Sequence, residues 1–154
     1  MRRKDKAMDK DTAAHLLQTG EYGILSTVDV QGQPYGVPLN YVFHDGCLYF
    51  HCALEGQKLD NLLANRRVSF CVVGPTRVLP EEFNTEYESV IAFGEASVVQ
   101  GDERHCALVR LVEKYSPDFI EEGHKYIERH DSRTLVVKIH IRSMTGKAKQ
   151  SPKM

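Results

Sequence analysis

Short segments of alternating apolar residues, separated by turn signals, constrain this chain more than any other feature of its sequence. In YGVPLNYVF, residues 35–43, every second side chain is large and apolar, which is the spacing of one face of a β-strand. QGQP, residues 31–34, links it to YGILSTVDV, residues 22–30, and an Asp45-Gly46 turn links it to CLYFHC, residues 47–52. The three segments predict an antiparallel meander.

Later segments predict three further strands, with helices between them. The strands cover residues 67–74, 86–99 and 135–143, and a proline-bounded loop is expected from the first of these to about residue 84. Helices are expected over residues 9–19 with Asp9 or Asp11 as the cap, from Glu55 or Gly56, from a cap at Asp102, and from Pro117. The 154 residues therefore predict a single α+β domain, a mostly antiparallel six-stranded β-barrel with flanking helices. Residues 1–8 and 148–154 are expected to be flexible tails.

Charge, hydropathy and cysteine usage exclude several classes of function. The chain has 20 basic against 21 acidic residues, so it has no global field that would attract nucleic acid or an anionic membrane surface. No apolar run approaches the roughly 18 residues of a membrane span. The four cysteines form no C-x-x-C pair and follow no secretory segment. We therefore expect a reduced, cytoplasmic protein without a disulfide framework or a metal site.

Two neighbouring segments offer the parts of a ligand site. His51 alternates to the face of its strand that carries fewer apolar residues, just before a helix start at Gly56, Gln57 and Lys58. Free backbone N–H groups at such a start bind anions, and Lys58 adds a full positive charge. The alternative is that Lys58 simply points into water, at a cost of about 0.3–1 kcal/mol against the helix dipole.

The strand before His51 supplies a possible wall for that site. One of its faces is made of Gly36, Pro38 and Asn40, with few bulky side chains. A proline and a glycine in mid-strand indicate an edge, a bulge or a close approach by another group. A flat ligand would fit against such a wall.

The sequence resembles the FMN-binding split-barrel proteins of the pyridoxamine 5′-phosphate oxidase-like family, most closely their nitroimidazole-resistance-type branch. The resemblance runs from about Thr12 to Lys147 and rests on three stretches in order: GVPLNYVF, GCLYFHCALEGQKLDNLLANRRVSF and YESVIAFGEA. Their most specific piece is a strand ending in Tyr-x-His, a Gly-x-Lys-Leu helix start and an Asn-x-Arg-Val-x-Phe strand entry.

The resemblance implies a set of cofactor contacts. The residues expected to lie along the flavin ring, flank it or bind the phosphate are Val37, Pro38, Leu39, Asn40, His51, Cys52, Ala53, Gln57 and Lys58. Among them, Lys58 is the expected phosphate ligand. Such proteins are homodimers with two sites at the subunit interface, and Ser89 matches a polar residue that approaches the flavin from the second subunit.

This chain also departs from the family pattern. The oxidase proper carries Ser-Arg-Lys where this chain has Gly56, Gln57 and Lys58, and an Arg and a Lys flank a strand where this chain has only VPLNY. The first difference removes two phosphate partners, and the second removes the anchor of a phosphorylated substrate. We therefore do not expect vitamin B6 oxidation.

The expected chemistry is electron transfer from reduced FMN to a small flat acceptor, a nitroaromatic or a quinone. His51 is the candidate catalytic residue, as a proton donor or a substrate contact, since a histidine exchanges protons around neutral pH. Alternatively, His51 only packs against the ring. Two other functions stay open: haem binding with His51 or His140 as axial ligand, and a flavin-binding protein without turnover. No G-x-G-x-x-G fingerprint identifies a nicotinamide electron donor.

Overall fold

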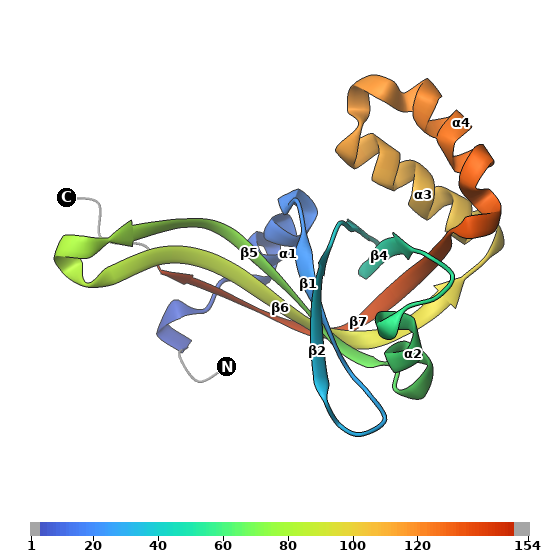
Figure 1. Cartoon of the computed structure of the whole chain (residues 1–154). Helices are drawn as coiled ribbons and strands as arrows, with labels where there is room; N and C mark the ends of the chain where they lie inside the picture. The colour runs from blue at the N-terminus through green and yellow to red at the C-terminus, as the bar shows by residue number, and fades with distance from the viewer. Residues whose placement is uncertain (1–3, 150–154) are drawn as a thin grey trace.

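A computed structural model describes residues 4–149 of the chain as one seven-stranded antiparallel sheet with helices on its faces (Figure 1). The strands are β1 Gly23–Val28, β2 Pro34–Leu39, β3 Val42–His44, β4 Cys47–Cys52, β5 Arg67–Leu79, β6 Asn84–Val99 and β7 Leu135–Lys149. The α-helices are α1 Lys10–Thr19, α2 Gln57–Ala64, α3 Gly101–Tyr115 and α4 Ile120–His130, and the 3-10 turns are η1 Lys4–Lys6, η2 Pro80–Glu82, η3 Pro117–Phe119 and η4 Asp131–Arg133. The strand order is β2-β1-β5-β6-β7-β4-β3.

The α+β split-barrel class is confirmed, but the sheet has seven strands where six were predicted. The expected strand over residues 35–43 is broken at Asn40 and Tyr41 into β2 and β3. The break occurs because the Tyr41 N–H donates to the hydroxyl of Tyr115 at 3.0 Å instead of to a neighbouring strand, while its own buried hydroxyl donates to the Leu17 carbonyl at 2.7 Å. Both predicted antiparallel pairings are confirmed, since β2 pairs with β1 and β3 pairs with β4. The break places them at opposite edges of the sheet, so the three segments do not form one continuous meander.

The break at Asn40 and Tyr41 also gives the sheet its shape. β2 and β3 are the two edges of the sheet, yet they follow one another in the chain. The sheet must therefore curl until its edges approach each other at this junction. Because β2 pairs only with β1 and β3 only with β4, the barrel stays split along these edges.

Two hydrophobic cores lie on opposite sides of the sheet. The inner core holds the apolar faces of α1 and α2 against strand residues such as Phe50 and Phe70, and burying each of these aromatics contributes about 1.5–3 kcal/mol. The outer core lies between β3, β4 and β7 and the helical hairpin α3–α4. The face of β4 that carries Cys47 and Tyr49 is therefore buried by a helix and does not form part of the surface.

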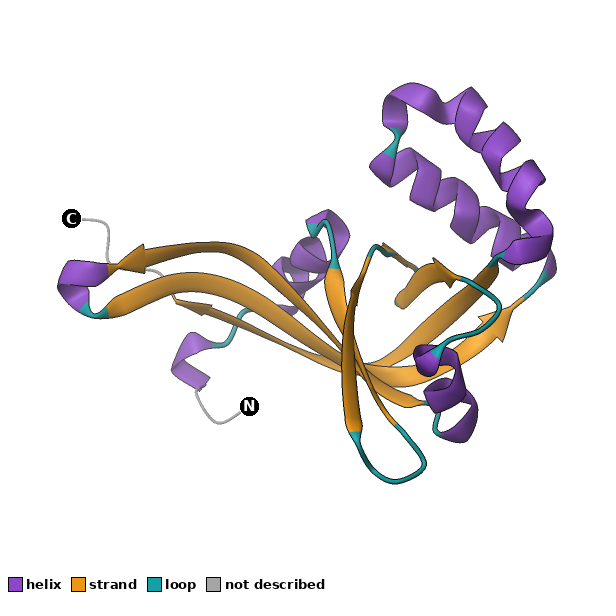
Figure 2. Cartoon of the chain, viewed as in Figure 1, coloured by secondary structure: helices purple, strands orange, loops and turns teal. Residues whose placement is uncertain are grey.

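A long arm made of β5, β6 and the end of β7 extends away from the barrel (Figures 1 and 2). The predicted loop up to residue 84 is mostly strand, since β5 and β6 pair as far as Leu79 and Asn84. The register shifts between Val73 and Thr76, around Pro75. A bulge accommodates a proline that has no N–H for the ladder, so pairing resumes beyond it.

The helix starts follow the local signals with one exception. Asp9 caps α1 by accepting from the Thr12 N–H at 2.9 Å, and Pro117 opens the η3 turn that leads into α4. The predicted cap at Asp102 is wrong, because the cap is Gln100, two residues earlier, and α3 begins at Gly101. Asp102 instead lies in the first turn, where its carboxylate favours the helix dipole.

The described parts of the two expected tails are paired rather than free. Ala7 forms a β-bridge with Lys147, and the Met8 N–H donates to the Gly146 carbonyl at 3.1 Å. Ala148 and Lys149, at the end of β7, pair with Glu88 and Tyr87 of β6. Residues 1–3 and 150–154, the remainder of the tails, lie outside the described residues. Within residues 4–149, no helix combines the length and the apolar character needed to cross a membrane.

Candidate functional site

All nine residues expected to contact the cofactor from one chain lie on three segments that meet beside the split. Edge strand β2 carries Val37, Pro38 and Leu39 and is followed by Asn40; the end of β4 carries His51, Cys52 and Ala53; and α2 begins with Gln57 and Lys58. Asn40 and His51 line one cavity, so the first two segments come together there. Lys58 interacts electrostatically with Cys52, which brings the helix start beside the end of β4.

Edge strand β2 presents the wall that the sequence predicts. Val37 and Leu39 are half-buried and pack against the inner core, whereas Gly36 and Pro38 are exposed on the opposite face. Because β2 pairs with β1 on one side only, the missing N–H of Pro38 costs no ladder bond to a second neighbour. The exposed backbone of this strand is thus accessible to a flat ligand.

The end of β4 places two titratable side chains in different surroundings. His51 is exposed, yet the side chains around its ring remove enough water to lower its pKa, so that the imidazole is neutral at neutral pH. Cys52 points into the inner core, where burial raises the pKa of its thiol against the opposing charge of Lys58. A neutral His51 can hold a proton on one ring nitrogen and accept a hydrogen bond on the other.

The start of α2 has the properties of an anion site. Its cap, Gly56, has a φ of 140° and no side chain, and the first helical hydrogen bonds are made by the N–H groups of Leu59 and Asp60 to the Gly56 carbonyl. The N–H groups of Gln57 and Lys58 precede these bonds and point out of the helix end. A side-chain atom built on Gly56 would meet no atom within 4 Å, so there is open space beside these groups.

A chain of buried hydrogen bonds fixes this helix start relative to β2. The Gln57 side-chain amide donates to Asn61 at 2.8 Å, Asn61 donates to Thr27 at 2.8 Å, and the Thr27 hydroxyl lies 3.4 Å from the Tyr35 carbonyl. Asn61 is 1% exposed, so losing either partner would leave a buried polar group unsatisfied. The chain therefore links the anion site on α2 through β1 to the wall on β2.

Ser89 lies on the arm, far from the other predicted residues of the same chain. It pairs with Val73 and Lys147, whereas β7 residue Val136 pairs with both His51 and Val99. Ser89 and Val99 are ten residues apart on β6, a separation of roughly 30 Å along an extended strand. Within one chain Ser89 therefore does not reach the site.

The sequence did not reveal a cavity of about 260 Å³ between α3, α4 and the end of β4. Its lining residues are Asn40, His51, Leu108, Leu111, Val112, Tyr115, Ser116, Tyr126, Ile127, His130 and Thr134. The amphipathic pattern of residues 108–115 predicted a helix that buries its apolar face, but not that this face would close over His51. The only local signal was the clustering of Tyr126 and His130 one helical turn apart.

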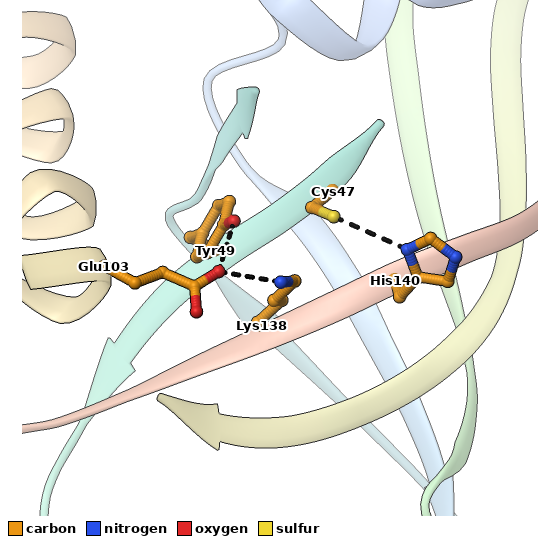
Figure 3. A network of polar contacts seen from close by, with 5 residues as sticks. All are labelled: Cys47, Tyr49, Glu103, Lys138 and His140. Carbon is orange, nitrogen blue, oxygen red and sulfur yellow. Dashed lines mark hydrogen bonds and ion pairs between the residues drawn. The ribbon is translucent and has the colours of Figure 1, made fainter. Parts of the chain in front are cut away.

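Polar contacts hold the N-terminal end of α3 against the sheet (Figure 3). Glu103, in the first turn of α3, accepts from the Tyr49 hydroxyl at 2.9 Å and pairs with Lys138 at 2.7 Å, and both partners hold the pKa of its carboxyl below the usual range. Cys47 and His140, a cross-strand pair on β4 and β7, lie 3.7 Å apart beside this network. His140 is exposed on the strand face predicted for it.

A second group of contacts holds the C-terminal end of α3. The Lys114 ammonium donates to the Gly20 carbonyl at 2.7 Å and to the Tyr41 carbonyl at 3.0 Å, and it lies 4.1 Å from the centre of the Tyr41 ring. Burial lowers the pKa of Lys114 to about 8. The Tyr115 hydroxyl lies 2.6 Å from the Glu21 carbonyl. Because α3 is attached at both ends, the wall that it gives to the cavity is fixed in place.

The fold and the three segments beside the split define a split-barrel protein. Comparison with known proteins identifies its family. Residues 9–148 match the pyridoxamine 5′-phosphate oxidase family over most of the chain, so the protein belongs to that family. None of the curated proteins compared with the chain matches it.

Solved structures share the fold at low sequence identity. A conserved hypothetical protein of Mycobacterium tuberculosis is 23% identical, with 100% of this chain and 95% of that chain covered and a TM-score of 0.84. A candidate 5-nitroimidazole antibiotic resistance protein of Bacteroides thetaiotaomicron is 21% identical, with 94% and 90% covered and a TM-score of 0.75. A FAD- and haem-binding protein of Mycobacterium smegmatis is 19% identical, with 95% and 74% covered and a TM-score of 0.81.

Proposed function

We propose that this protein binds FMN in the split between β2 and β4 and uses it to reduce a small flat acceptor, a nitroaromatic or a quinone. The observation that carries the proposal is the meeting of a bare strand wall, a histidine-bearing strand end and a helix start with a lysine. A flat ring needs a wall with few side chains, and a phosphate needs free N–H groups and a cation. Membership of the family supports the same ligand.

The phosphate of FMN would lie at the start of α2. Lys58 and the N–H groups of Gln57 and Lys58 would hold it in the open space beside Gly56. No serine or arginine side chain stands at the first two positions of this trio, so Lys58 is the side chain on which phosphate affinity depends. A bound phosphate would attract both the lysine and the helix N-terminus and so would offset the unfavourable interaction between them.

FMN, when bound, would supply the redox chemistry, and the chain would supply binding, orientation and a hydrogen-bond donor. His51 is neutral at neutral pH because the side chains around its ring desolvate it and lower its pKa, so it would act through a ring N–H that donates to a polar atom of the acceptor. The β2 segment Val37–Asn40 orients the ring. Vitamin B6 oxidation is not proposed, because VPLNY provides no cation for a substrate phosphate.

We also propose that the protein forms a homodimer with two cofactor sites at its interface. The outer face of the sheet carries exposed apolar residues on three adjacent strands: Ile24 at 38%, Val73 at 52%, Ile91 at 39% and Phe93 at 50% exposure. Ser89 alternates onto this same face of β6, two residues before Ile91. A second copy packed on this face would bury the apolar residues and bring Ser89 toward its cofactor.

The dimer is tested with a charge on that face. We expect Ile91→Glu to convert a dimer into a monomer in sedimentation and to weaken FMN binding, whereas Val30→Glu, on a turn outside the face, changes neither. A wild-type protein that sediments as a monomer and binds FMN fully would contradict the proposal.

Haem is a second candidate cofactor, supported by the name of the Mycobacterium smegmatis neighbour and by the place of His51 beside a cavity. The cavity beside His51 has a volume of about 260 Å³, below the usual range of about 300–1,000 Å³ for drug-sized ligands, so it is too small for a haem macrocycle. His140, the other histidine considered as an axial ligand, lies against Cys47 on a different part of the sheet.

The reaction is tested in a single turnover. FMN-loaded protein is reduced with dithionite without air and mixed with a nitroaromatic, and flavin reoxidation is followed by absorbance. We expect rapid reoxidation that His51→Gln slows while FMN stays bound. Reoxidation by the wild-type protein no faster than by free reduced FMN would refute the oxidoreductase function and leave a flavin-binding protein without turnover.

A further inference from the structure

We infer that the cavity between α3, α4 and the end of β4 binds the acceptor, a small neutral molecule with one flat ring and polar groups at its ends. The inference rests on the proposed function, because it names the site from which the acceptor would meet the cofactor. His51 and Asn40 belong both to the lining of this cavity and to the segments expected to contact FMN. The cavity thus begins where the proposed cofactor site ends.

The size and lining of the cavity select a single ring. Its volume is about 260 Å³, which is below the usual range for drug-sized ligands of about 300–1,000 Å³. The walls are formed by Leu108, Leu111 and Val112 of α3 and by Ile127 of α4. Flat apolar rings gain the most from such walls, because little polar surface has to be desolvated.

The charges around the cavity select a neutral molecule. None of the described residues that line it is Asp, Glu, Lys or Arg, so the described walls offer no counter-charge to an ion. The polar groups on one wall already have partners: the Asn40 amide donates to the Glu21 carbonyl at 3.0 Å, and the Tyr115 hydroxyl lies against the carbonyls of Glu21 and Tyr41. These two groups shape the wall rather than bind the ligand.

Among the polar groups of the lining, the two histidines can bind polar ends of the ligand. The His130 Nδ1 lies 3.0 Å from the Tyr126 carbonyl, which only accepts, so this nitrogen carries the proton in the neutral ring. Its Nε2 is then an acceptor for a ligand N–H or O–H. The Tyr126 ring stacks on His130 at 4.1 Å and fixes its plane. The neutral His51 supplies a donor for an acceptor atom such as a nitro oxygen.

The probe 4-nitroaniline combines these features, since it is flat, neutral and single-ringed, with an amine at one end and a nitro group at the other. We expect equilibrium dialysis to detect its binding to the protein both without FMN and with FMN bound. We expect Val112→Phe, which fills the cavity, to weaken binding about tenfold, or about 1.4 kcal/mol. The matched control is Val109→Phe on the same helix, which does not line the cavity and should leave binding unchanged.

A second variant separates the histidine contact from any effect on folding. We expect His130→Leu to weaken 4-nitroaniline binding about tenfold but to leave nitrobenzene binding unchanged, because nitrobenzene has no donor for Nε2. Urea unfolding of each variant shows whether it is folded. Equal effects of Val112→Phe and Val109→Phe, no response to His130→Leu, or complete displacement of the probe by FMN would each overturn the inference. A protein that binds the probe but no FMN would instead refute the proposed function alone.

Discussion

Replacing Lys58 with alanine is expected to change the stability of the flavin-free protein and its affinity for FMN in opposite directions. Without an anion, Lys58 lies in the first turn of α2, where it opposes the helix dipole. Its removal should stabilise the flavin-free protein by about 0.3–1 kcal/mol, or roughly 1–4 °C in Tm. With FMN bound, the same change would remove the cation that we propose binds the phosphate.

The loss of affinity follows from the half-buried position of Lys58. Two unit charges about 4 Å apart attract by about 4 kcal/mol at an effective dielectric constant of about 20, and partial exposure reduces this value. A hydrogen bond to a charged group contributes about 1.5–3 kcal/mol. The Kd for FMN should therefore rise roughly 10- to 150-fold.

Titration of FMN and of riboflavin, followed by flavin fluorescence, measures this effect. Riboflavin lacks the phosphate, so Lys58→Ala should leave its Kd unchanged. Lys10→Ala is the matched control, because Lys10 is an exposed lysine at the start of α1. It should raise stability to a similar extent without changing either Kd. Equal losses for FMN and riboflavin would show that Lys58 supports the site but does not bind the phosphate.

Three further changes test other parts of the account. Asn61→Leu should lower the free energy of unfolding in urea by about 1–3 kcal/mol, because it leaves Thr27 and Gln57 without their partner; an unchanged midpoint would contradict this role. Because the pKa of Lys114 is about 8 when folded and about 10.4 when unfolded, the unfolded chain binds more protons between these values, so stability should rise with pH from about 8 to 10. Lys114→Met should abolish that rise. Because burial lowers the pKa of His51, the part of the pH–rate profile that is lost in His51→Gln should have its inflection below about 6.5, and an inflection above that value would contradict a desolvated ring.

The features that the sequence predicted correctly depend on residues close together in the chain. The cap at Asp9, the turn at Asp45 and Gly46, where both φ values are positive, and the start of α2 after Gly56 are all local signals. Strand alternation likewise predicted the inner core, since buried Val137 and Ile139 lie on the predicted face of β7. The arrangement of Lys58 beside Cys52 follows directly from the short strand–turn–helix connection.

The features that the sequence did not predict depend on contacts over long separations. The break at Tyr41 exists because Tyr115, 74 residues later, supplies a hydrogen-bond partner to its N–H. The burial of Tyr49 depends on Glu103 and α3, and the cavity exists because residues of α3 and α4, among them His130, line one space with His51 of β4. No pattern within a single segment contains such information. Pro75 indicated a loop, but a bulge accommodates it within β5, and pairing on both sides of the bulge extends the strands past it.

The central claim, that FMN binds in the split, is tested most directly by the absorption spectrum of the purified protein after incubation with excess FMN and removal of unbound flavin. We predict the two-band spectrum of a flavin at one FMN per chain in the wild-type protein, and a much smaller flavin content in Lys58→Ala treated in the same way. A protein that stays colourless, or that shows an intense Soret band and takes up no flavin, would contradict the account.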